Sequence, residues 1–150
     1  MLLGPEAAQI QVIAKIDSLD AVQNYTSIIK HADGVVILRN ELAFELEPEK
    51  LMIAQKWMIQ TANLASIPVF LQSQVLESML TNNITAARQE TMDVSSAVME
   101  GADVFILSHE TSCGSHAVDA TILLAKSIAE AENVYDHEQT YQELRNIAKS

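Results

Sequence analysis

The sequence predicts an α/β fold in which four βα units form a parallel sheet. Short apolar runs of strand type recur along the chain, and a longer segment with helical periodicity follows each of them. With 150 residues, of which 49% are hydrophobic, the chain can bury the core of one domain. We therefore expect a single domain over residues 1–150, with a helical tail at about 136–150.

The expected strands are rich in β-branched and aromatic residues and are flanked by polar or turn-forming residues. They span Ile10–Ile16, Val35–Leu38, Val69–Leu71 and Val104–Leu107. Two of them repeat a local pattern: Ala-Asp stands shortly before the strand, and an acidic residue, Glu41 or Glu110, stands three positions past it. Equivalent units arranged around one axis would produce this internal repeat.

The first two helices follow the first two strands. The first is expected from about Ser18 to Lys30, with Ser18 as its N-cap. The second is expected from about Pro48 to Leu64, because proline is tolerated in the first turn of a helix. We expect Trp57 of this second helix to lie in the core.

The later helices surround a polar loop. Two shorter helices, about Val75–Leu80 and Glu90–Glu100, are expected on either side of an exposed stretch at Thr81–Thr85. Gly101 follows as a candidate for the left-handed residue that ends a helix. A long helix is then expected from about Ala117 to Val134, and the polar tail contains one further helical stretch.

Charge and cysteine content limit the partners and the compartment. The formal net charge is −11 and the basic residues form no stripe, so nucleic acid and anionic membranes are poor partners. Cys113 is the single cysteine, which excludes an intrachain disulfide and favours a reducing, cytoplasmic location. The N-terminal MLLGPEAAQI lacks the features of a signal peptide, and no apolar run approaches the roughly 20 residues that span a bilayer.

Polar residues gather just past the end of each predicted strand, where ligands bind in parallel βα folds. They are Lys15 and Asp17; Arg39, Asn40 and Glu41; Ser73 and Gln74; and Ser108, His109 and Glu110. Asp17 and Glu41 offer the hard oxygen ligands that Mg²⁺ accepts. The alternatives are that Asp17 assists helix capping and that Glu41 is a solvated loop acid. Lys15, a charge within a strand, should point into a polar site or pair with an acid.

Other site chemistries find no support in the residue pattern. Ser73 and Ser108 lack the adjacent histidine, acid and glycine elbow of a serine hydrolase. His109 and His116 lack the spacing of a zinc pair. Only four glycines occur, and they form no phosphate-binding loop.

Four segments together resemble the pyruvate kinase family, in the same order and spacing and over nearly the whole chain. They are VIAKID, DGVVILRNELAFELEPEKLMIAQK, IPVFLQSQVLESML and MDVSSAVMEGADVFILSHET. The resemblance implies half of a TIM-type (β/α)₈ barrel, equivalent to units five to eight of the catalytic domain. It also implies that the first four strands, the lid domain and the C-terminal domain have no counterpart in this sequence.

The resemblance further implies site roles. Lys15 matches the lysine that stabilises the phosphoryl group in transfer, and Ser73 replaces the threonine that delivers a proton to the enolate. Asp17 and Glu41 match the two ligands of the divalent cation, each with its side chain changed in length by one methylene. Arg39, Asn40 and Glu41 match the loop that binds the substrate, phosphoenolpyruvate or pyruvate. Asn40 stands where the family has a glycine.

The same loops depart from the family at further positions. Ala43 and His109 also replace glycines, and the loop between Met79 and Arg88 is expected to be one residue longer.

Two functions remain open. The chain is either a non-catalytic relative kept as a structural or interaction module, or part of an active pyruvate kinase that needs the missing half barrel. A half barrel leaves unpaired sheet edges, so we expect a protein partner or a second copy.

Overall fold

The computed structural model describes residues 10–81 and 84–147. Outside these residues lie positions 1–9, where no signal peptide was expected, and positions 82–83 in the loop between Met79 and Arg88. The sheet contains β1 (Ile13–Ile16), β2 (Gly34–Leu38), β3 (Val69–Gln72) and β4 (Val104–Ile106). All pairings are parallel and the order is β1-β2-β3-β4, which confirms the predicted architecture.

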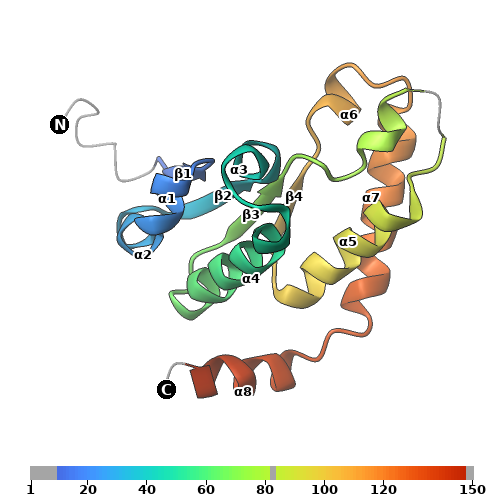
Figure 1. Cartoon of the computed structure of the whole chain (residues 1–150). Coiled ribbons are helices and arrows are strands. Elements are labelled where there is room, and N and C mark those ends of the chain that lie inside the picture. The colour runs from blue at the N-terminus through green and yellow to red at the C-terminus, as the bar shows by residue number, and fades with distance from the viewer. Residues whose placement is uncertain (1–9, 82–83, 148–150) are drawn as a thin grey trace.

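The helices follow the strands in the alternating order that the sequence predicted. They are α1 (Leu19–Gln23), α2 (Tyr25–Ile28), η2 (Ile29–His31), α3 (Arg39–Glu45), α4 (Pro48–Leu64), η3 (Glu77–Leu80), α5 (Arg88–Glu100), α6 (His109–Ser112), α7 (Ala117–Glu132) and α8 (His137–Ile147). Helices α4, α5 and α7 lie next to one another around the outside of the sheet, and α8 lies apart from the others (Figure 1). None of the helices in the described ranges is long and apolar enough to cross a membrane.

The prediction of one continuous helix after β1 was wrong. Ser18 caps α1 as expected, since its hydroxyl accepts a hydrogen bond from the Ala21 N–H at 3.3 Å. The helix then breaks at Asn24, whose side-chain amide donates to a backbone carbonyl of the preceding turn. The break lets Tyr25 enter the core, where it is fully buried and donates to the Met58 carbonyl at 2.9 Å.

Helix α4 has the predicted bounds, but Trp57 does not lie in the core. Proline stands in its first turn as expected, and Met58, Ile59 and Ala62 are fully buried. Trp57 is 42% exposed, and its ring centroid lies 5.5 Å from that of Tyr25. The indole therefore lies partly over the buried phenol at the edge of the core.

The internal repeat has a structural basis. Asp33 and Asp103 directly precede β2 and β4, and each makes two hydrogen bonds to one residue at or directly before the start of the neighbouring strand. The Asp33 carboxylate accepts from the Val12 N–H at 2.7 Å, and its own N–H donates to the Val12 carbonyl. The Asp103 carboxylate likewise accepts from the Val69 N–H at 2.8 Å, and the Asp103 N–H donates to the Val69 carbonyl. The two aspartates thus join equivalent neighbouring strands.

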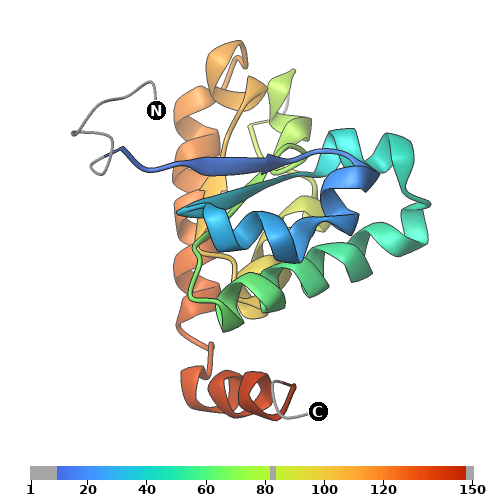
Figure 2. The same cartoon turned by 90° about the vertical axis from the view of Figure 1, so that its left-hand side faces the viewer.

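The two faces of the sheet differ in coverage. Ile16, Ile37 and Leu71 form a row across β1 to β3 and are fully buried beneath the helices. On the opposite face, a second row runs from Lys15 through Val36 and Phe70 to Val104, and none of its members is fully buried. Figure 2 shows β1 as the strand nearest the viewer, at the edge of the sheet. One face is therefore covered, and the other is only partly covered.

Candidate functional site

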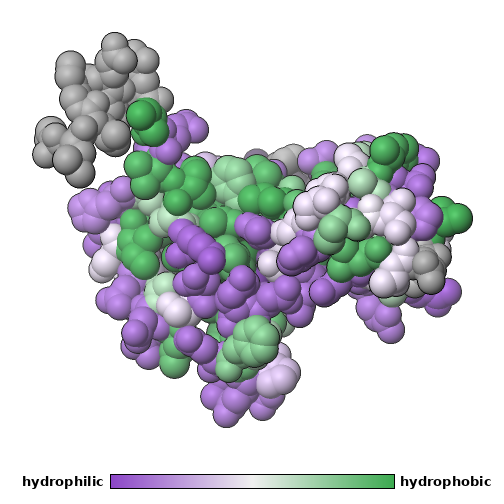
Figure 3. Space-filling model, turned by 90° about the horizontal axis from the view of Figure 1, so that it is seen from above, coloured by the Kyte–Doolittle hydropathy of each residue, from purple (hydrophilic) through white to green (hydrophobic). Residues whose placement is uncertain are grey.

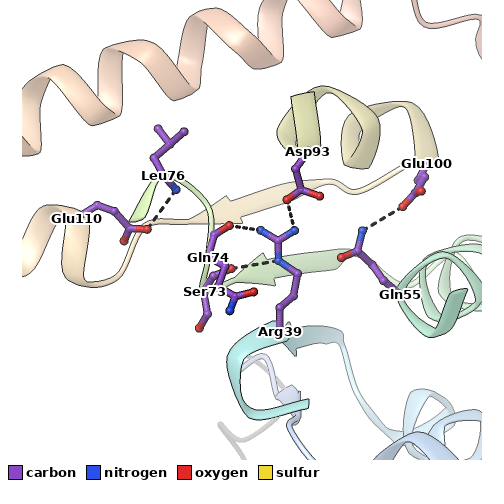
Figure 4. Close-up of polar contacts among 8 residues, drawn as sticks. All are labelled: Arg39, Gln55, Ser73, Gln74, Leu76, Asp93, Glu100 and Glu110. Carbon is purple, nitrogen blue, oxygen red and sulfur yellow. Dashed lines mark hydrogen bonds and ion pairs between the residues drawn. The ribbon is translucent and has the colours of Figure 1, made fainter. Parts of the chain in front are cut away.

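The candidate site lies at the carboxyl ends of the strands, which meet at one edge because the sheet is parallel. The loop after β2 and the turn after β3 are in direct contact there, as the contacts of Arg39 with Ser73 and Gln74 show (Figure 4). The turn after β3 is joined to the loop after β4, since Gln72 donates to the Ser108 hydroxyl at 3.0 Å. The predicted gathering of polar residues at this edge is thus observed for these three loops.

Arg39 is the most buried charged residue at this edge after Glu110. It begins α3 and is only 5% exposed. Its Nε donates to the Ser73 carbonyl at 3.1 Å, one terminal nitrogen donates to the Gln74 carbonyl at 2.6 Å, and the other forms an ion pair with Asp93 of α5. The guanidinium is thus held by protein groups on three sides, and it orders the turn after β3.

Ser73 faces a small cleft in a turn with unusual backbone geometry. Ser73 and Gln74 have φ values of 71° and 53°, in the left-handed region that non-glycine residues rarely adopt. The cleft is about 10 Å³ in volume, and its lining includes Asn40, Ser73, Ser108 and His109. A space of this size accommodates about one water molecule.

Glu110 ties the two loops together from the β4 side. Glu110 is 3% exposed, and its carboxylate accepts hydrogen bonds from the Leu76 N–H at 3.3 Å and the Ser108 N–H at 2.8 Å. Two backbone donors that would otherwise be unpaired are therefore satisfied by one buried acid. The sequence placed Glu110 at the rim but gave no sign of this bracing role.

Lys15 pairs with an acid, as its position within a strand predicted. Its Nζ lies 3.1 Å from Asp17 Oδ2, and the two side chains are 53% and 38% exposed. An ion pair this open to solvent contributes little to stability. The Asp17 carboxylate forms the ion pair with Lys15. The helix cap of α1 is the Ser18 hydroxyl.

Glu41 contains a buried carboxylate oxygen. Its Oε2 has no hydrogen-bond partner among the described residues. A buried carboxylate oxygen is costly to leave unpaired, so this atom fits a cation as ligand. In the described part of the chain, no group of three or more His, Cys, Asp or Glu side chains is placed to hold a metal ion. A cation bound by Glu41 would therefore need further oxygen ligands such as water or substrate.

A second polar contact lies behind the site, between α4 and α5. Gln55 is 3% exposed and donates to Glu100 Oε2 at 3.1 Å (Figure 4). Burial raises the pKa of the Glu100 carboxyl above its ordinary value, while the Gln55 amide opposes that rise. The sequence gave no signal for this pair or for Asp93, because their contacts join residues 45 and 54 positions apart.

Comparison with known proteins identifies the family. The model of the pyruvate kinase barrel domain matches residues 1–121. Pyruvate kinase PKLR of Rattus norvegicus is 41% identical over 146 residues, which cover 97% of this chain and 25% of the relative. Pyruvate kinase of Eimeria tenella is 39% identical over 94% of this chain and 26% of its own length. The chain belongs to the pyruvate kinase family.

Solved structures agree with this assignment. A crystal structure of pyruvate kinase from Cryptosporidium parvum superposes with a TM-score of 0.88 at 37% identity, covering 91% of this chain and 28% of that chain. A second structure of a pyruvate kinase from that organism, in complex with ADP, gives a TM-score of 0.86. The four parallel βα units are thus half of a pyruvate kinase barrel, and the chain spans about a quarter of the length of the curated relatives it matches.

Proposed function

We propose that this chain is a half-barrel interaction module of the pyruvate kinase family that performs no phosphoryl transfer by itself. The observation that carries the proposal is the incompletely covered sheet: β1 is an edge strand, and no residue in the row from Lys15 to Val104 is fully buried. In addition, Asn40 and His109 line the small cleft beside Ser73 at positions where the family resemblance implies glycine, and a side chain leaves a substrate less room there than glycine would.

The open sheet supports a protein partner. The unpaired edge at β1 is flanked by the exposed apolar residues Ile10, Val12 and Ile13, which are 56%, 55% and 40% exposed. Figure 3 shows hydrophobic side chains gathered at the upper left of the described part of the molecule. Unpaired edges and uncovered apolar faces favour association. A partner that supplies further parallel strands, either a second copy or another protein, would cover both.

Size-exclusion chromatography with light scattering tests this proposal. A second copy would give twice the monomer mass of 16.5 kDa, and a different protein partner would raise the mass when it is added. Val12→Lys should weaken either association, because it places a charge beside the β1 edge. Ile53→Lys is the matched control, since Ile53 is 70% exposed on α4, away from that edge. A well-behaved monomer that melts cooperatively and binds no partner would contradict the proposal.

The second candidate is a catalytic half barrel. It is favoured by the buried Oε2 of Glu41, which has no hydrogen-bond partner among the described residues. In a barrel completed by the missing half, Lys15 would stabilise the transferred phosphoryl group and Ser73 would deliver a proton. Arg39, Asn40 and Glu41 would form the loop beside phosphoenolpyruvate, with Asp17 and Glu41 holding Mg²⁺. When bound, the cation would offset negative charge on the substrate oxygens.

Two measurements separate the candidates. Calorimetric titration with Mg²⁺ or Mn²⁺ should show binding that Glu41→Gln abolishes if the carboxylate is a ligand, and no binding if it is not. A coupled assay of pyruvate release from phosphoenolpyruvate and ADP, with and without Mg²⁺, reports turnover. Clear turnover by the purified chain would exclude the non-catalytic module. For either function we propose a cytoplasmic location, on the basis of the single cysteine.

A further inference from the structure

The turn after β3 needs an external restraint. Ser73 and Gln74 are consecutive non-glycine residues with positive φ, at 71° and 53°. In this region the Cβ atom of an L-residue crowds its own carbonyl oxygen, so such residues persist only where surrounding contacts define them. The direction of the Ser73 side chain depends on this backbone geometry, because a return to negative φ would swing it to another orientation.

Arg39 supplies the restraint. Its Nε and one terminal nitrogen donate to the carbonyls of Ser73 and Gln74, at 3.1 and 2.6 Å (Figure 4). Because the guanidinium is a rigid plane, two such bonds fix the orientation of two successive peptide groups relative to each other. A lysine at this position, with a single ammonium on a flexible stem, would not reproduce that geometry.

Asp93 in turn holds Arg39. Arg39 is 5% exposed, and Asp93 of α5 forms an ion pair with the third nitrogen of its guanidinium. A buried guanidinium without a counter-charge is unfavourable and would turn toward solvent or another acid. The side chain of Asp93 is 37% exposed, so it approaches the buried arginine from the side of the molecule that water can reach.

We propose that Asp93 is a positioning residue for Ser73 and that it acts through Arg39. The pair holds the turn in its left-handed conformation and thereby aims the Ser73 hydroxyl at the cleft that Asn40 and Ser108 also line. This inference rests on the proposed function only where the catalytic candidate assigns proton delivery to the Ser73 hydroxyl. The geometry of the turn can be measured without any turnover.

The test measures φ at Ser73 and Gln74 by NMR scalar couplings, together with deuterium uptake of the turn, in the full chain. Asp93→Asn keeps the size of the side chain and removes its charge. We expect loss of the positive-φ couplings and deuterium uptake in the turn about tenfold faster. Arg39→Lys, which keeps the charge but not the planar fork, should have the same effect. Glu47→Gln is the control, because it removes a solvent-exposed ion pair with Lys50.

A second-site substitution distinguishes positioning from general support of the fold. Glycine adopts positive φ without strain, so Gln74→Gly in the Asp93→Asn background should restore the left-handed geometry at position 74. If Asp93→Asn and Arg39→Lys both keep the couplings, or if the glycine restores nothing, the proposal is overturned. In a completed, active barrel, Asp93→Asn should lower kcat and leave KM unchanged. Absence of pyruvate formation would count against the catalytic candidate and not against this positioning role.

Discussion

Replacement of Gly101 by alanine tests how α5 is joined to β4. Gly101 ends α5 with φ of 97°, and its N–H donates to the Val98 carbonyl at 2.9 Å. A Cβ atom at this position would lie 2.4 Å from the side-chain nitrogen of Asn63 on α4. That nitrogen now donates to the Gly101 carbonyl at 3.0 Å. The substitution therefore perturbs both the backbone conformation and a contact between two helices.

The expected cost is the sum of two effects. A non-glycine residue in the left-handed region loses about 1–2 kcal/mol. Displacement of the Asn63 amide sacrifices one hydrogen bond, worth about 1 kcal/mol. Gly101→Ala should therefore lower the free energy of unfolding by about 2–3 kcal/mol, which corresponds to a fall in Tm of about 5–10 °C for a chain of this size.

Urea unfolding followed by circular dichroism, with thermal melts, measures this loss. The matched experiment is the double-mutant cycle with Asn63→Ala, in which the added methyl group has room and the hydrogen bond is already absent. In that background Gly101→Ala should cost only the backbone part, about 1–2 kcal/mol. An equal loss in both backgrounds would refute the proposed collision with Asn63, and a loss below about 0.5 kcal/mol would refute the whole reasoning.

Three further predictions concern buried polar groups. Burial raises the pKa of Glu100 above 4.5, so the folded state binds this proton more tightly than the unfolded state does. Stability therefore falls as the pH rises through the raised pKa. Glu100→Gln should remove that fall and raise Tm at neutral pH, and an unchanged pH profile of Tm would contradict this. Tyr25→Phe should cost about 1 kcal/mol in urea unfolding, because it removes the hydrogen bond to the Met58 carbonyl; a stabilised variant would argue against that bond. Glu110→Gln loses one of the two backbone hydrogen bonds that the carboxylate accepts and should cost about 1–3 kcal/mol, with faster hydrogen exchange at the Leu76 amide as the local signature.

Elements defined by local chemistry were predictable from the sequence. The parallel strands follow from short β-branched runs, and α4 follows from its helical periodicity and first-turn proline, with bounds that match the structure. Gly101 was expected to end α5 because a left-handed residue commonly terminates a helix, and its φ of 97° confirms this. The Ala-Asp repeat also pointed correctly to equivalent βα units.

Elements defined by distant contacts were not predictable in the same way. The segment after β1 reads as one helix, yet it breaks before Tyr25, whose hydroxyl bonds a carbonyl 33 positions away. Trp57 has a large apolar side chain of the kind found in protein cores, but its position on α4 leaves it 42% exposed. The short helix α6 was not expected, and the segment predicted as a helix at Val75–Leu80 contains the 3₁₀ turn Glu77–Leu80.

The sequence by itself determined the family, the order of the βα units and the residues that reach the strand ends, because these depend on residue type, spacing and periodicity along the chain. Only the tertiary structure decided how those residues are used. It showed Arg39 bound to Asp93 and to the turn at Ser73, and Oε2 of Glu41 buried without a partner among the described residues. These states depend on burial and on contacts across the fold, and neither is encoded in local spacing.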